Sequence, residues 1–112
     1  MKLPNADHCV VHEAKALTYL LCLTHPSGRS KAKFFLGRGF RPDEWRIFAE
    51  AMIEHGRTYD VFEVVPTEFG VTYTVEGPLT TPDGRSSRVR SVWMIDRGQT
   101  RPRLISAYPA KG

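Results

Sequence analysis

The segment DEWRIFAEAMIEHGRTYDVFEVV (residues 43–65) decides the fold, because the spacing of its apolar residues changes halfway along it. We expect Asp43 to cap a helix here, Phe40 to pack on its first turn, and the His55-Gly56 pair to end it. Beyond Thr58 the apolar repeat shortens from 3.6 residues to two, as in a strand. The apolar residues of the helical half fall at the i, i+3, i+4, i+7 and i+8 positions of an amphipathic helix: Trp45, Phe48, Ala49, Met52 and Ile53.

The residues after this switch predict a sheet. Residues 59–65, 71–76, 88–95 and 104–108 are rich in β-branched and aromatic side chains, as strands are. Short connections such as Pro82-Asp83-Gly84 separate these segments, and turns of this length join consecutive strands as hairpins. We therefore expect an antiparallel meander.

The residues before the switch predict two further helices. Residues 13–23 carry leucines at helical spacing, and residues 29–36 would bury Ala32, Phe35 and Leu36 before Gly37 ends the helix. Residues 9–11 form a short apolar piece, typical of an edge strand. Helices followed by strands are typical of α+β proteins. We predict a single α+β domain, residues 1–112, with about three N-terminal helices packed on a four-stranded antiparallel meander sheet.

The composition is that of a soluble globular domain. The 112 residues are 41% hydrophobic and 25% charged, which is ordinary for one folded domain. No apolar run approaches the length of a membrane span, and residues 1–8 carry no apolar signal region, so we expect a cytoplasmic protein without a membrane partner. Cys9 and Cys22 are too few for a zinc site or a disulfide framework, and we expect buried thiols. We expect no cofactor and no metal.

The charges are unevenly placed along the chain. Residues 25–41 hold five bases and no acid, residues 42–79 hold eight acids and two arginines, and residues 80–112 hold seven bases and two acids. If the fold brings the two basic blocks together, they form a positive surface suited to phosphates. The eleven arginines against five lysines favour bidentate phosphate contacts.

Residues 25–35, HPSGRSKAKFF, combine a turn with the start of a basic helix. Ser27 or Ser30 can cap this helix. The positive end of the helix dipole disfavours Arg29, Lys31 and Lys33 in the first turn, but a docked anion would make them favourable. The alternative is a solvated basic face.

No nucleotide-binding, metalloprotease or serine-hydrolase motif occurs in the sequence. The remaining candidates fit metal-independent RNA cleavage, which needs a base for the 2′-OH, an acid for the leaving oxygen and cations for the phosphorane charge. The alternatives are that His25 caps its turn, that Lys31 is a surface residue, that Arg88 and Arg90 pair with Glu63 or Glu76, and that Tyr108 is core. The predicted catalytic residues are His25, Lys31 and Tyr108, and the predicted substrate-binding residues are Arg29, Arg88, Arg90 and Ser91.

Several short motifs resemble those of an uncharacterised bacterial domain family. They are LPN (residues 3–5), YLL (19–21), HPxGxxKAxFF (25–35), GPLxxPxG (77–84), VW (92–93) and AYP (107–109). Members of that family occur as small standalone proteins and as C-terminal modules of polymorphic toxins. The expected order of elements also resembles the barnase–EndoU–colicin–RelE group of ribonuclease toxins. This chain has no second histidine on the predicted sheet, so Lys31 or Tyr108 would share the proton transfer.

Two functional hypotheses follow. The first is a toxin-like domain that cleaves or binds RNA in a basic cleft and has a cognate antitoxin or immunity protein as a partner. The second is a non-catalytic protein-interaction module of a toxin–antitoxin or related bacterial system. That module would bind through the acidic face of the third helix or through the basic sheet.

Overall fold

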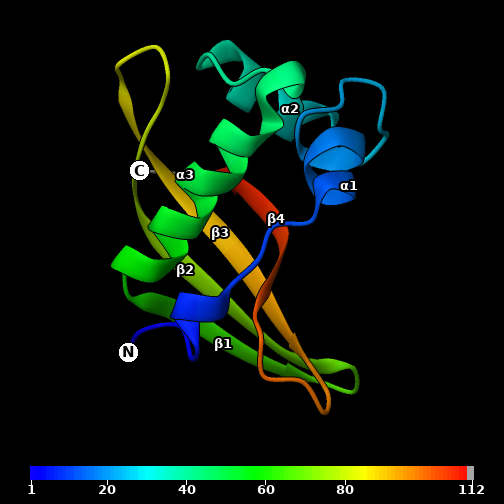
Figure 1. Cartoon of the computed structure of the whole chain (residues 1–112), viewed down its shortest axis with the longest axis vertical. Coiled ribbons are helices and arrows are strands. Elements are labelled where there is room, and N and C mark those ends of the chain that lie inside the picture. The colour runs from blue at the N-terminus through cyan, green and yellow to red at the C-terminus, as the bar shows by residue number, and fades with distance from the viewer. Residues whose placement is uncertain (111–112) are drawn as a thin grey trace.

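The computed structural model describes residues 1–110, and its elements follow the predicted order (Figure 1). The helices are α1 (Glu13–Lys15), which continues as a π-helical turn over Ala16–Leu20, α2 (Arg29–Gly37) and α3 (Trp45–Thr58). The strands are β1 (Val61–Thr67), β2 (Gly70–Thr80), β3 (Ser86–Asp96) and β4 (Arg103–Pro109). Single 3₁₀ turns cover Ala6–His8 and Pro42–Glu44. The predicted α+β class, with helices preceding an antiparallel sheet, is confirmed.

The sheet is a meander with strand order β1-β2-β3-β4 and antiparallel pairing throughout. Its longest ladder joins β2 and β3 and runs from the Gly70–Asp96 pair to the Thr80–Ser86 pair. Helix α3 crosses one face of this sheet (Figure 1). On β3, Val89, Ser91 and Trp93 point toward α3 and are buried, whereas Arg88 and Arg90 alternate with them and face the other way. We call this second face the open face.

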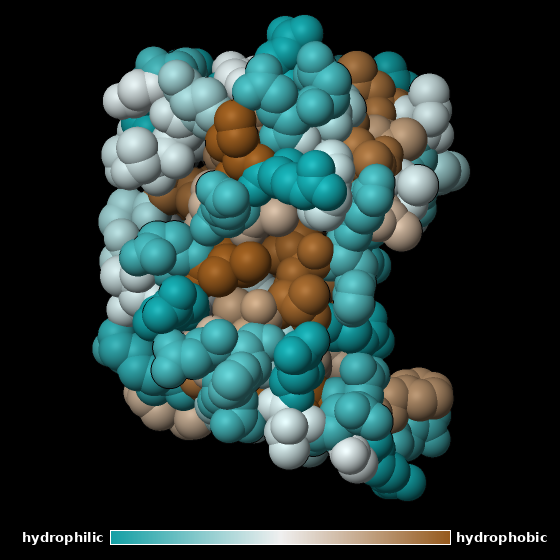
Figure 2. Space-filling model, viewed as in Figure 1, coloured by the Kyte–Doolittle hydropathy of each residue, from teal (hydrophilic) through white to brown (hydrophobic). Residues whose placement is uncertain are grey.

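Aromatic rings fill the core between the helices and the sheet. Phe35 of α2 makes edge contacts with Phe40 and Phe48 at ring-centre distances of 6.1 and 5.1 Å. Trp93 of β3 lies beneath α3, and a Cβ on Gly56 would come within 2.6 Å of its ring. The absence of a side chain at Gly56 therefore lets α3 lie close to the sheet. Viewed as in Figure 1, the surface is mostly hydrophilic, with hydrophobic areas near its centre and in its upper part (Figure 2).

The structure corrects both predicted ends of α3. Glu44 is the residue at the N-terminal boundary and makes no side-chain cap, while Asp43 forms an ion pair with Arg41 at 3.4 Å. The Pro42–Glu44 turn leads directly into the helix, so no capping carboxylate is in position. The helix also continues through Gly56 to Thr58. Packing against Trp93 holds Gly56 in the helix, overriding its usual tendency to end one.

The first helix and the N-terminal segment also differ from prediction. The helix predicted over residues 13–23 ends at Leu20, and its last turn is π-helical, with the N–H of Leu21 bonded to the carbonyl of Ala16 at 2.8 Å. The predicted edge strand over residues 9–11 is reduced to a single parallel bridge between Val10 and Arg103. None of the helices within residues 1–110 combines the length and apolar character that crossing a membrane requires.

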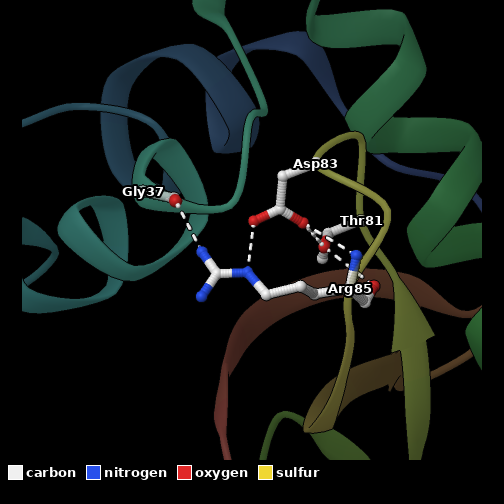
Figure 3. Close-up of polar contacts among 4 residues, drawn as sticks. All are labelled: Gly37, Thr81, Asp83 and Arg85. Carbon is white, nitrogen blue, oxygen red and sulfur yellow. Dashed lines mark hydrogen bonds and ion pairs between the residues drawn. The ribbon is translucent and has the colours of Figure 1, made fainter.

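A polar network joins the β2–β3 turn to the end of α2 (Figure 3). Asp83 accepts hydrogen bonds from Thr81 and from the backbone N–H and side chain of Arg85, whose Nε lies 2.7 Å away. The same guanidinium reaches the carbonyl of Gly37 at 3.5 Å. Hydrogen bonding from Thr81, followed by that from Arg85, lowers the pKa of Asp83 to about 2. The two basic blocks of the sequence therefore meet in the fold at this turn.

Candidate functional site

Lys31 connects three elements that are distant in sequence. Its Nζ donates hydrogen bonds to the hydroxyl of Tyr19 in the π-helical turn and, at 2.8 Å, to Ser106 Oγ on β4. The same ammonium lies 4.9 Å from the ring centre of Tyr19 and 5.8 Å from that of Tyr108. The side chain is half-buried at the β4 edge of the sheet. Lys31 therefore holds a fixed positive charge between two aromatic rings.

Further cations and rings extend this arrangement in both directions. Lys15 lies 5.0 Å from the Tyr19 ring. Arg90 is the direct cross-strand partner of Tyr108, and its guanidinium lies 4.3 Å from the ring centre of Phe62 on β1. Cations and rings thus alternate across the β4 edge and the open face. We call this set the cation–ring row: Lys15, Tyr19, Lys31, Tyr108, Arg90 and Phe62.

The pKa of Tyr19 is lowered by its neighbours in the row, and the sequence reasoning did not identify Tyr19 as a site residue. Burial raises the pKa of this phenol, but hydrogen bonds with Lys31 and Ser106 and the charges of Lys31 and Lys15 outweigh burial and lower it overall. A lowered pKa increases the fraction of phenolate, which can accept a proton. Lys15 lies four residues before Tyr19, a visible helical spacing, but the decisive contact with Lys31 is tertiary.

His25 is a neighbour of Tyr19 that lies outside the cation–ring row. Its ring packs edge-on against Tyr19 at 4.9 Å, and both residues line an open hollow of about 450 Å³ with Lys15. Its Nδ1 accepts the backbone N–H groups of Ser27 and Gly28, each at 3.0 Å. The predicted turn-capping alternative is therefore confirmed, and neither serine caps α2. With Nδ1 acting as acceptor, the ring proton of neutral His25 is on Nε2.

The two arginines of β3 form ion pairs with a glutamate, as one of the alternative interpretations of the sequence predicted. Arg88 and Arg90 bond to opposite oxygens of Glu76 at 2.8 and 2.7 Å. Hydrogen bonds from Arg90 and then Arg88 lower the pKa of Glu76, which keeps it ionised. Two guanidiniums share one carboxylate, so the cluster keeps a net positive charge. Arg29 is exposed at the start of α2 and makes no side-chain hydrogen bond or ion pair within residues 1–110.

Ser91 lies away from the other predicted site residues. It is fully buried beneath α3, where its Oγ lies 2.8 Å from His55 Nδ1 and accepts the indole N–H of Trp93 at 2.9 Å. The other ring nitrogen of His55 lies 3.0 Å from the carbonyl of Val89. Burial lowers the pKa of His55, partly offset by its hydrogen bonds to backbone carbonyls. Ser91 therefore stabilises the packing of α3 on the sheet, and it has no exposed surface for a substrate.

Comparison with known proteins adds a fold relationship and a family. No curated protein gives a significant match to the sequence. One chain of the contact-dependent growth inhibition toxin–immunity protein complex from Klebsiella pneumoniae 342 is similar in structure, with a TM-score of 0.71 over 96% of this chain and 97% of that one. The two are 19% identical, so the likeness concerns the fold. The model of a family described as a domain of unknown function (DUF6883) matches residues 2–111, and the chain belongs to that family.

Proposed function

We propose that this protein is a toxin-type domain that binds and cleaves RNA through the cation–ring row. The observation that carries the proposal is the position of Lys31, whose ammonium lies between the rings of Tyr19 and Tyr108 and is bonded to the Tyr19 hydroxyl. Two neighbouring nucleotides of RNA supply a phosphate for the cation and one base for each ring. No acid other than Glu76 pairs with these cations within residues 1–110.

RNA binding follows from the alternation of charges and rings. Single-stranded nucleic acids bind to proteins by stacking bases on aromatic side chains while cations follow the backbone, and each stacked base contributes about 1–3 kcal/mol. Tyr108 and Phe62 offer rings on the open face, with Arg90 between them. Arg88 would contact a neighbouring phosphate, since more than half of its side chain is exposed. Arg29 would do the same from the start of α2.

Cleavage requires two proton transfers and a stabilised phosphorane. In molecules in which Tyr19 is ionised, a form that its lowered pKa favours, the 2′-oxygen attacks the phosphorus as its proton passes to the Tyr19 oxygen. The bond to the 5′-oxygen breaks as Tyr108 donates a proton to that oxygen. Lys31 balances the charge that develops on the phosphoryl oxygens. His25 donates its Nε2 proton to the phosphate as a hydrogen bond and keeps Nδ1 on its turn. The products are a 2′,3′-cyclic phosphate and a 5′-hydroxyl, and no metal ion is needed.

The toxin assignment rests on two likenesses. The short motifs resemble a family with members in polymorphic toxins, and the fold is similar to that of a chain in a toxin–immunity protein complex. We infer that this chain acts on cytoplasmic RNA and that a cognate immunity protein or antitoxin neutralises it.

The test is incubation of the purified protein with total RNA in EDTA. Wild type should produce fragments with cyclic phosphate ends, and Lys31→Ala should not. Lys33→Ala is the matched control, because Lys33 is an exposed lysine of the same helix. A DNA strand with one ribonucleotide should be cut only after that ribonucleotide. No cleavage by wild type, or equal cleavage by all three proteins, would refute the proposal.

One observation favours the alternative of a non-catalytic interaction module. Strand β1 is an edge strand, and four apolar side chains at or beside it are exposed, namely Phe62, Val64, Val65 and Phe69. An edge strand with apolar side chains can pair with a strand of a protein partner. Growth of bacteria expressing wild type or Lys31→Ala separates the two functions. The nuclease proposal expects only wild type to stop growth, whereas an interaction module predicts that both proteins behave alike.

A further inference from the structure

A second basic hollow lies at the other end of β4, beside the β3–β4 turn. Its volume is about 430 Å³, and its lining includes His12, Arg97, Arg101 and Arg103. None of these residues belongs to the cation–ring row. Three guanidiniums around one open hollow present several N–H donors in the planar arrangement that matches phosphate oxygens.

The one carboxylate in this hollow is already neutralised. Asp96 accepts two hydrogen bonds from Arg103, at 2.8 and 3.1 Å, and this contact lowers the pKa of Asp96. Arg97 and Arg101 are exposed, and neither forms an ion pair with another residue in the range 1–110. Two guanidiniums therefore remain available to an anion.

The fold holds this hollow in place. Gly98 adopts a positive φ of 80° in the turn, and the N–H of Gln99 bonds to the carbonyl of Asp96 at 2.8 Å. The N-terminal segment braces the far side of the loop, since Val10 exchanges backbone hydrogen bonds with Pro102 and Leu104 at 2.9 and 3.0 Å. An anion would meet a loop that is already ordered, and the entropy cost of binding is correspondingly small.

The hollow and the cation–ring row lie along the same edge of the sheet. Arg103 begins β4, and Ser106 and Tyr108 follow on it, so the two sites are separated by about 17 Å at the rise of a strand. The N-terminal segment also links the two sites. His12 lines the hollow and directly precedes α1, and Lys15, which belongs to the cation–ring row, is the last residue of α1. At a stacked rise of about 3.4 Å per nucleotide, this separation corresponds to roughly five nucleotides.

We propose that the hollow formed by Arg97, Arg101 and Arg103 is a second phosphate-binding subsite, which holds the RNA strand about five nucleotides from the reacting linkage. This inference rests on the proposed function, because it assigns the same RNA to both sites. It predicts that long RNA binds more tightly than short RNA, and that the difference depends on these arginines.

The experiment compares Arg97→Ser/Arg101→Ser with wild type and with Arg41→Ser/Arg46→Ser. The control pair removes the same charge from exposed arginines at the start of α3. A fluorescent ten-nucleotide oligouridine measures binding at several salt concentrations. The dinucleotide uridylyl-adenosine is too short to reach the second site, so it measures cleavage alone. Losing two phosphate contacts should reduce the slope of log affinity against log salt concentration by about 1.4. Between 1 M and 0.1 M salt, the affinity of the variant should therefore fall behind that of wild type by a further factor of roughly 25.

We expect Arg97→Ser/Arg101→Ser to bind the decamer with the reduced salt slope and affinity, and to cleave the dinucleotide as fast as wild type. An equal loss in the control variant, or an unchanged salt slope in Arg97→Ser/Arg101→Ser, would overturn the subsite. So would a wild-type protein that does not bind the decamer. Binding of the decamer without any cleavage would refute the nuclease proposal alone, and the slopes would still decide the subsite.

Discussion

Replacement of Lys31 by methionine removes the central charge of the cation–ring row while keeping a side chain of similar length. Burial raises the pKa of Tyr19, and Lys31 is one of the groups that lower it, by both a hydrogen bond and its charge. In Lys31→Met the effect of burial remains, and the hydrogen bond from Lys31, which is the first of the groups that lower the pKa, is lost together with its charge. The pKa of Tyr19 should therefore rise. Each unit of that rise would measure about 1.4 kcal/mol of differential interaction between Lys31 and the two forms of the phenol.

The same change should lower stability. Lys31 donates two charge-assisted hydrogen bonds, to Tyr19 and Ser106. Such bonds contribute about 1.5–3 kcal/mol when buried, and the half-exposed position of Lys31 reduces this contribution. We expect a loss of about 1.5 kcal/mol in the free energy of unfolding, and a Tm lower by roughly 6 °C for a domain of this size. Lys33→Met should change stability by less than about 0.5 kcal/mol.

The assay is an ultraviolet titration of tyrosinate absorbance. The chain has four tyrosines, so the difference between each protein and its Tyr19→Phe counterpart isolates the Tyr19 signal. The reasoning predicts that Tyr19 ionises at lower pH in wild type and in Lys33→Met than in Lys31→Met. If Tyr19 ionises at the same pH in all three, the lysine does not act on the phenol and the account of the row is wrong.

Three further predictions concern the rest of the fold. Gly56→Ala should cost about 1–3 kcal/mol of unfolding free energy in denaturant titrations, because its Cβ would lie 2.6 Å from the buried Trp93 ring, and an unchanged midpoint would contradict this packing. Since folding lowers the pKa of Asp83 to about 2, its contribution to stability should be complete above about pH 4 and disappear toward pH 2. The difference in Tm between wild type and Asp83→Asn should then shrink as the pH falls from about 4 toward 2. A difference that stays constant would refute the coupling between the ionisation of Asp83 and stability. Iodoacetamide should label Cys22, whose pKa is lowered by hydrogen bonding to Thr24, before Cys9, whose pKa burial raises to about 11, and equal labelling would count against the placement of either thiol.

Local periodicity was sufficient to predict the architecture. The change of repeat after Thr58 separates the helices from the strands, and short turns allow little except a meander. Element ends were less predictable because tertiary contacts set them. Gly56 remains helical against Trp93, and a histidine, not a serine, binds the N–H groups before α2. Cys9 is buried as predicted, whereas Cys22 is partly exposed.

The candidate site was predictable only in part. Alternation along β3 places Arg88 and Arg90 on one face of the sheet and Ser91 on the other, so Ser91 does not share a surface with the two arginines. The convergence of Lys31 with Tyr108 needed the fold, since 77 positions separate them in the sequence. Tyr19 was missed for the same reason. Its altered pKa depends on a lysine from another helix, which no local pattern contains.

The most direct test of the central claim is the single-turnover rate of RNA cleavage in EDTA by wild type, Lys31→Met and Lys33→Met. Loss of one group that stabilises charge in a transition state typically lowers the rate about 100- to 1,000-fold. The account predicts a loss of this size in Lys31→Met, with Lys33→Met within about twofold of wild type. Equal rates in Lys31→Met and Lys33→Met, or no cleavage by wild type, would contradict it.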